Sequence, residues 1–173
     1  VPEPRLALAA VKFNRRCLVA ELLRLGMDVD FAPCADRAIP GAHDVIGDRA
    51  VHTEPGTIAA MSTAALEGML DQGVLGVIKH LPGHGRAMAD SHLEFPVVDV
   101  DAETLFTRDF AAFKAIEGAL MAMTAHAVYS AIDPAHTATH SRDVIDKVLR
   151  GQNGFTGVVV NERRSRQRAA GQQ

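Results

Sequence analysis

The chain has 173 residues, of which 47% are hydrophobic and 23% are charged, proportions that are ordinary for a globular domain with its own core. Its 18 basic and 21 acidic side chains leave a formal net charge of −3, which gives no reason to expect a nucleic-acid or membrane partner. No apolar run is long enough to cross a membrane, and no signal peptide is visible. Cys17 and Cys34 both fall on apolar patterns, so we expect small core cysteines without a disulfide and a reducing, cytoplasmic location.

Predicted helices and strands alternate along the chain. Apolar residues at helical spacing predict each helix, and short apolar runs bounded by Gly, Pro or polar residues predict each strand. In chain order the sequence predicts a helix over 5–25, a strand over 28–33, a helix over 57–70, a strand over 74–78, a helix over 101–117, a strand over 119–124, a helix that Ser141 caps and Gly151 follows, and a strand over 155–160.

The predicted strands are followed by long polar loops, whereas the helices lead into the next strand by short turns. This alternation is typical of parallel βα units, in which chemistry gathers at the carboxyl ends of the strands. The fold class is therefore α/β. On this pattern alone, half of an eight-stranded barrel and a small open sheet are both possible.

The loop after the second predicted strand, KHLPGHGRAMADSHLEFP, carries the most chemistry and begins at Lys79. Within it, Asp90 lies two residues before His92. A carboxylate so close to an imidazole can fix its tautomer and raise its basicity for proton transfer near neutral pH. Three interpretations compete: an Asp–His acid/base pair, a metal site that adds His80 and His84 to these two groups, and a polar loop whose histidines only bond the backbone.

This loop resembles the signature of family 3 glycoside hydrolases, in the β-N-acetylhexosaminidase branch: K-H-x-P-G-H-G, then D-S-H and a proline. Flanking segments are similar too, namely GMDVDFAP at 26–33, GDR at 47–49, MTAH at 123–126 and GFTG at 154–157. The resemblance covers about residues 5–160. It implies an incomplete (β/α)8 TIM-type barrel of about four βα units.

The resemblance also implies an activity. Members of this branch hydrolyse terminal N-acetylglucosamine β-glycosides with retention, without a cofactor, and act on N-acetylglucosamine-containing muropeptides in cell-wall recycling. We therefore expect a small carbohydrate substrate and no metal, since neither an HExxH sequence nor a cysteine pair is present.

Individual residues take roles from the same resemblance. His92 corresponds to the general acid/base and Asp90 to its dyad partner. Lys79, His80 and Arg49 correspond to sugar-binding groups. These roles suit the chemistry, because Lys and Arg donate to hydroxyl or acetamido oxygens and an imidazole donates or accepts. The alternatives are that Arg49 is a surface cation and Lys79 a structural ion-pair partner.

The sequence departs from the family pattern at the nucleophile. A retaining enzyme needs a second carboxylate, which forms a covalent glycosyl-enzyme. In the family it is the first Asp of an S-D-D-L-type sequence, whereas here Val160 is followed by Asn161, Glu162 and Arg163. Glu162 falls on the nucleophile position but is one methylene longer, so it is either a displaced nucleophile or a coincidental carboxylate.

The family's upstream E-G-G-R segment and its substrate-binding Asp are not found in the sequence. We therefore expect a partial barrel domain over 1–160, truncated at both ends, and a basic, disordered tail over 161–173. Three functions follow as hypotheses: a β-N-acetylhexosaminidase, an inactive remnant that binds sugar weakly, and a metal-dependent hydrolase built on the histidine cluster. Missing neighbouring strands would leave open sheet edges, which favour aggregation.

Overall fold

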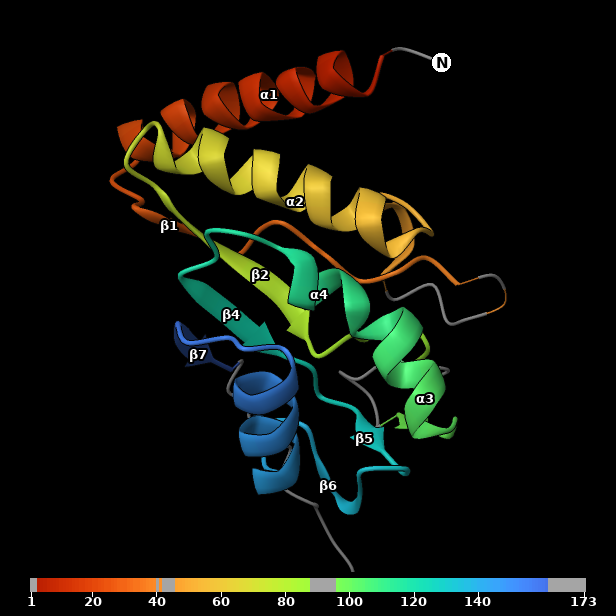
Figure 1. Ribbon diagram of the computed structural model, residues 1–173. Coiled ribbons are helices and arrows are strands. Elements are labelled where there is room, and N and C mark those ends of the chain that lie inside the picture. Colours follow the sequence, from red (N-terminus) through yellow and green to blue (C-terminus); the bar gives the residue numbers. More distant parts are fainter. Residues whose placement is uncertain (1–2, 40, 42–45, 88–95, 162–173) are drawn as a thin grey trace, which may run out of the picture.

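A computed structural model describes residues 3–39, 41, 46–87 and 96–161. Its main sheet contains β1 (Val29–Asp30), β2 (Leu75–Leu81), β4 (Met121–Thr124) and β7 (Val158–Val160). All neighbouring pairs in this sheet are parallel, and the strands lie side by side in chain order (Figure 1). The α/β class with a parallel sheet is therefore confirmed.

A smaller sheet lies beyond the carboxyl ends of these strands. It contains β3 (Val97–Val98), β5 (Val128–Tyr129) and β6 (Asp133–Thr137). β3 and β5 are parallel, and β5 and β6 are antiparallel. The sequence predicts only loop in these segments, because the strands are short and carry little apolar alternation.

Helices connect the strands of the main sheet. In chain order they are α1 (Pro4–Arg24), the 3-10 helix η1 (Gly47–Arg49), α2 (Pro55–Leu70), α3 (Ala102–Thr104), the π-helix η2 (Leu105–Asp109), α4 (Ala111–Ala115) and the π-helix η3 (Asp143–Gln152). α1 packs on α2, and α2 packs on β2, so α2 lies between α1 and the sheet (Figure 1). Within the described ranges, no helix is both long and apolar enough to cross a membrane.

Two helix ends differ from the prediction. The helix expected to end before Gly151 runs on to Gln152, and Gly154 takes the left-handed conformation (φ +67°) after it. The Ser141 cap is confirmed, because its Oγ accepts a hydrogen bond from the Val144 amide at 3.1 Å. The helix expected over 101–117 divides into α3, η2 and α4 and ends at Ala115.

The main core lies between the sheet and the helices that follow it. Phe110 is 1% exposed, and its ring packs edge-on against the rings of Phe106 and Tyr129, with centroids 5.5 and 5.4 Å away. Cys34 is buried as predicted, whereas Cys17 is exposed and that prediction is wrong. The apolar stripe of α1 is wider than its buried face, and only Val19 of this helix is fully buried.

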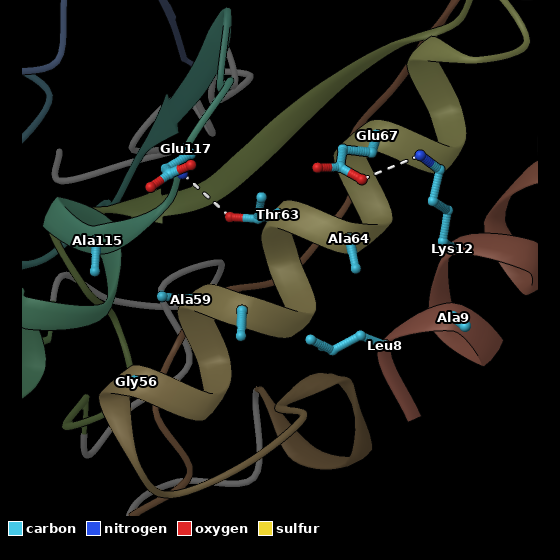
Figure 2. Close-up of a pocket in the computed structure, with 11 residues that line it drawn as sticks. Leu8, Ala9, Lys12, Gly56, Ala59, Thr63, Ala64, Glu67, Ala115 and Glu117 are labelled. Carbon is cyan, nitrogen blue, oxygen red and sulfur yellow. Dashed lines mark hydrogen bonds and ion pairs between the residues drawn. The ribbon is translucent and has the colours of Figure 1, made fainter. Parts of the chain in front are cut away.

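A groove of about 520 Å³ lies on the helical side of the molecule, between α1, α2 and the end of α4 (Figure 2). Small side chains such as Ala59 and Ala64 line it. At its rim the Lys12 Nζ contacts the Glu67 carboxylate at 3.1 Å. The described residues that line the groove come from α1, α2 and the end of α4, and none of them lies at the carboxyl ends of the strands.

Candidate functional site

Lys79 and His80 lie inside β2, close to its carboxyl end, as the sequence predicts. The strand is longer than predicted, because pairing with β4 carries it on to Leu81. The register shifts between Lys79 and Leu81, so His80 has no partner in the ladder. A shift of this kind re-aims a side chain, and it releases the His80 amide to donate elsewhere.

The freed amide and the ring of His80 both donate to Asp36, which lies beyond the end of β1. The His80 amide is 3.1 Å from Asp36 Oδ2, and His80 Nδ1 is 2.6 Å from the same oxygen. Because an ionised carboxylate only accepts, Nδ1 carries the proton. The Asp36–His80 pair therefore fixes the ring orientation and leaves Nε2 for another partner.

Asp36 is fully buried and gathers two further donors. The His84 amide donates to Oδ1 at 2.6 Å, and the Cys34 thiol donates to Oδ2 at 3.3 Å. Burial alone would raise the pKa of the Asp36 carboxyl. The charge and hydrogen bond of His80, with the His84 amide, outweigh burial, so the pKa lies below its usual value. Asp36 is therefore a buried carboxylate anchor for both strand ends.

His84 is 3% exposed, and neither of its ring nitrogens has a hydrogen-bond partner in the part of the chain that is described. Its ring lies edge-on to that of His80, with centroids 5.6 Å apart. Burial lowers the pKa of His84; the Asp36 charge opposes this, and the nearby His80 and His126 add to it. The ring is therefore held neutral.

Cys34 shares this buried environment. Burial raises the pKa of its thiol to about 12, the Asp36 carboxylate adds to the rise, and the Arg49 charge opposes it. Arg49 is thus close enough to act electrostatically on the cluster. Its side chain is exposed, and its Nε donates to the Ile46 carbonyl at 3.2 Å.

A second carboxylate holds the loops around this cluster. Asp109 of η2 is 4% exposed. Its Oδ2 is 2.5 Å from the Arg86 Nε, and its Oδ1 is 3.4 Å from an Arg37 Nη1. Gly85 lies against the same arginine, since a Cβ there would be 2.1 Å from the Arg37 carbonyl oxygen. The loops after β1 and β2 are thereby fixed to the helix layer.

Two more groups from the ends of β4 and β5 border the site. The His126 ring is half-buried, and its Nδ1 lies 3.0 Å from the Thr139 hydroxyl. Tyr129 donates its phenolic proton to the Gly83 carbonyl at 2.6 Å. Neither His126 nor Tyr129 is among the site residues that the sequence predicts. The Tyr129 hydroxyl therefore fastens the turn of the KHLPGHG segment to β5.

Lys79 is half-buried, and its ammonium has no ion-pair partner among the described residues. The structural ion pair considered from sequence is thus not found within those ranges. Asp90, His92 and Glu162, the three predicted catalytic residues, lie outside the described residues. Lys79 and His80 therefore lie next to each other near the end of β2, and the Arg49 charge acts on Cys34 of the neighbouring cluster.

Comparison with known proteins agrees with the sequence signature. Residues 7–170 match the glycosyl hydrolase family 3 N-terminal domain. A β-hexosaminidase of Aromatoleum aromaticum is 39% identical over 158 residues, which are 90% of this chain and 44% of that protein. The matched range runs past residue 160, where the domain boundary is predicted, and that boundary stays a prediction.

Solved structures are similar as well. NagZ from Neisseria gonorrhoeae, in complex with N-trifluoroacetyl-D-glucosamine, is 33% identical to this chain and superposes with a TM-score of 0.85. The matched region covers 91% of this chain and 47% of the NagZ chain. A family 3 β-N-acetylglucosaminidase from Paenibacillus sp. has a TM-score of 0.84 and 35% identity, over 90% of this chain and 30% of its own. The chain thus spans less than half the length of these relatives. With this match over nearly all of its residues, the chain belongs to glycosyl hydrolase family 3, as part of the N-terminal domain.

Proposed function

We propose that this chain supplies sugar-binding and acid/base groups of a β-N-acetylhexosaminidase, which removes terminal N-acetylglucosamine from β-glycosides. The observation that carries the proposal is the pair Lys79 and His80 at the end of β2, with the His80 ring fixed by buried Asp36 at 2.6 Å. The similar proteins named β-hexosaminidase support the substrate class. We extend the proposal to muropeptides as substrates, in cell-wall recycling in the cytoplasm.

The sheet is proposed to belong to a (β/α)8 barrel. Its strands are parallel and follow one another in chain order, as strands of such a barrel do. Lys79 and His80 lie at the carboxyl end of β2, and Asp36, Arg49 and His84 come from the segments after β1 and β2, where barrel enzymes place their chemistry. In this arrangement the strands described here form one arc of the barrel wall.

Sugar recognition in the proposal rests on cationic and imidazole donors. The half-buried Lys79 ammonium has three protons to donate. It has no ion-pair partner among the described residues, and sugar hydroxyl or acetamido oxygens would accept its hydrogen bonds. The His80 Nε2 is left free by the bond from Nδ1 to Asp36. Arg49, whose charge acts on the same cluster, supplies a further donor at the rim.

The proposed chemistry is a two-step displacement with retention. His92, oriented by Asp90, protonates the glycosidic oxygen while a carboxylate attacks the anomeric carbon and forms a glycosyl-enzyme. Water then attacks that carbon, and the same histidine takes the proton from the water. Glu162 is the candidate nucleophile of this chain, and a displacement of about 1 Å would cost on the order of 10²-fold in rate.

The proposal is tested with 4-nitrophenyl N-acetyl-β-glucosaminide as substrate. We expect release of 4-nitrophenol by the purified chain, loss of turnover in His92→Ala, and a raised KM in Lys79→Met, because the ammonium contributes binding. His136→Ala, which changes an exposed histidine outside the cluster, should retain full turnover. Proton NMR should show the β-anomer of the sugar as first product.

Two results would contradict this proposal. Equal turnover in His92→Ala would remove its acid/base role, and turnover that a chelator abolishes would favour a metal-dependent hydrolase. A chain that binds N-acetylglucosamine by NMR shift but never releases nitrophenol would be an inactive sugar-binding remnant.

A further inference from the structure

We propose that Cys34, Asp36 and His80 form a binding site for a divalent transition-metal ion of borderline softness, of the Zn²⁺ or Co²⁺ type. The site goes beyond the sugar-cleaving proposal and does not depend on it. It also differs from the metal site considered from sequence, because it uses a thiol and a carboxylate that lie outside the loop after β2.

The geometry of the three donors is the first argument. One ligand atom from each residue, the Cys34 Sγ, an Asp36 oxygen and a His80 ring nitrogen, all lie within 4.8 Å of one another. Tetrahedral Zn²⁺, with bonds of about 2.0–2.3 Å, holds its ligand atoms roughly 3.4 Å apart. The Cys34–Asp36 separation of 3.3 Å already fits, and the His80–Asp36 separation of 2.6 Å must open by less than about 1 Å.

The rigidity of the donors is the second argument. Cys34 pairs with Lys79 as an isolated parallel bridge, and the Ala35 amide donates to the Lys79 carbonyl at 2.7 Å. The backbone that carries Cys34 and Asp36 is therefore fastened to the strand that carries His80. Donors held on paired backbone lose little entropy when they bind an ion.

The charge balance is the third argument. A thiolate and a carboxylate carry together the two negative charges that a divalent ion neutralises, so no net charge is buried. On binding, the Cys34 thiol loses its proton to solvent, and the His80 ring, which then binds the ion through Nδ1, carries its own proton on Nε2 instead. One proton is therefore released for each ion bound. Sulfur, nitrogen and oxygen donors together suit Zn²⁺ or Co²⁺ better than Mg²⁺ or Ca²⁺.

His84 gives an independent observation that points to a ligand. Its buried ring lies edge-on to the ring of His80 and has no hydrogen-bond partner for either nitrogen among the described residues. Buried polar atoms without partners are rare in folded proteins, and an ion or its bound water would supply one. The His80 side chain is 19% exposed, which leaves the cluster a route from solvent.

The test is a Co²⁺ titration of the apo chain followed by absorption spectroscopy. We expect the intense visible bands of tetrahedral Co²⁺ and a thiolate-to-Co²⁺ charge-transfer band in the near ultraviolet, both saturating at one ion per chain. A pH indicator in weak buffer should register one proton released per ion. Cys34→Ser should lose the charge-transfer band, whereas Cys17→Ser, which changes the exposed cysteine, should keep it.

A second variant tests the site without changing Cys34, so that its result does not depend on whether Cys34→Ser folds. His80→Gln should weaken Co²⁺ binding at least tenfold while far-UV circular dichroism stays unchanged. Zn²⁺ should raise the Tm of the wild type and of Cys17→Ser but not of Cys34→Ser. A charge-transfer band that survives in Cys34→Ser, or Co²⁺ binding lost in His92→Ala but unchanged in His80→Gln, would place the ion elsewhere and overturn the proposal.

Discussion

His84 and Asp36 are both buried, and both have lowered pKa values for opposite reasons. Burial lowers the pKa of His84 because it disfavours the charged ring. The folded state thus binds a proton less readily than the unfolded state, so stability falls as pH drops below about 6.5, the unfolded value. The stabilising contribution of Asp36 is lost only in a separate window, below about pH 4.

We predict that the free energy of unfolding is lower at pH 5.5 than at pH 7.5. The slope from His84 has an upper limit of about 1.4 kcal/mol per pH unit. Urea unfolding at both pH values measures it, and His84→Gln should reduce the difference. His136→Gln, at an exposed histidine, serves as the control and should keep the difference. An unchanged pH dependence in His84→Gln would show that another group titrates.

At this scale the sequence predicts the position of Lys79 and His80 at a strand end but not what surrounds them. Asp36 is not among the predicted site residues, although its carboxylate fixes the ring of His80. The reason is physical: the bonds of Asp36 join residues more than forty positions apart, and no local pattern encodes such a contact. The signal that was available is its place just beyond a predicted strand.

The contact between α1 and α2 depends on one glycine. A Cβ at Gly68 would be 2.3 Å from the Lys12 carbonyl oxygen, which is backbone and cannot turn away. We predict that Gly68→Ala destabilises the fold by about 1–3 kcal/mol, because α1 must shift. Gly56→Ala, in the same helix with open space around it, should be neutral or stabilise by as much as about 1 kcal/mol. Equal urea midpoints for the two variants would contradict this contact.

The segment from α3 to α4 is joined to the core through an aromatic ring. Phe110→Ala should cost about 3–5 kcal/mol in the free energy of unfolding, because it leaves a cavity beside Phe106 and Tyr129. Phe13→Ala, at a ring that is 67% exposed, should change stability by less than about 0.5 kcal/mol. Guanidinium unfolding compares them, and similar losses would mean that the exposed ring is also packed.

The hydrophobic periodicity of the sequence predicts which of the longer helices and strands form, but it does not predict where they end. The helices over 5–25 and 57–70 agree with α1 and α2 to within two residues at each end. The helix over 101–117 is divided, since η2 changes its winding around Leu105–Asp109 where Asp109 turns toward two arginines. Such tertiary ion pairs override local preference. The short β3, β5 and β6 have no sequence signal of their own.

At the scale of the whole molecule, β7 has a strand partner on one side only within the described part of the chain. Val158 on this edge is 57% exposed. We predict that Val158→Lys raises the monomer fraction in sedimentation velocity, because a charge on an edge strand disfavours pairing between chains. Thr156→Lys adds the same charge just before the strand and should leave the distribution unchanged. If the monomer fraction rises equally in both variants, the cause is the change in net charge and not the edge strand, and the prediction is wrong.

The carboxylate of Asp109 couples three segments of the chain through its two arginine partners. Its two arginines come from the loops after β1 and β2, which are far apart in the chain, so the two loops share one anchor in η2. When that helical turn opens, both loops lose this shared anchor, and we expect the three segments to open together as one cooperative unit. Amide hydrogens near Arg37 and Arg86 should then exchange with the same opening free energy. The rim of the site would be present as a whole or absent as a whole.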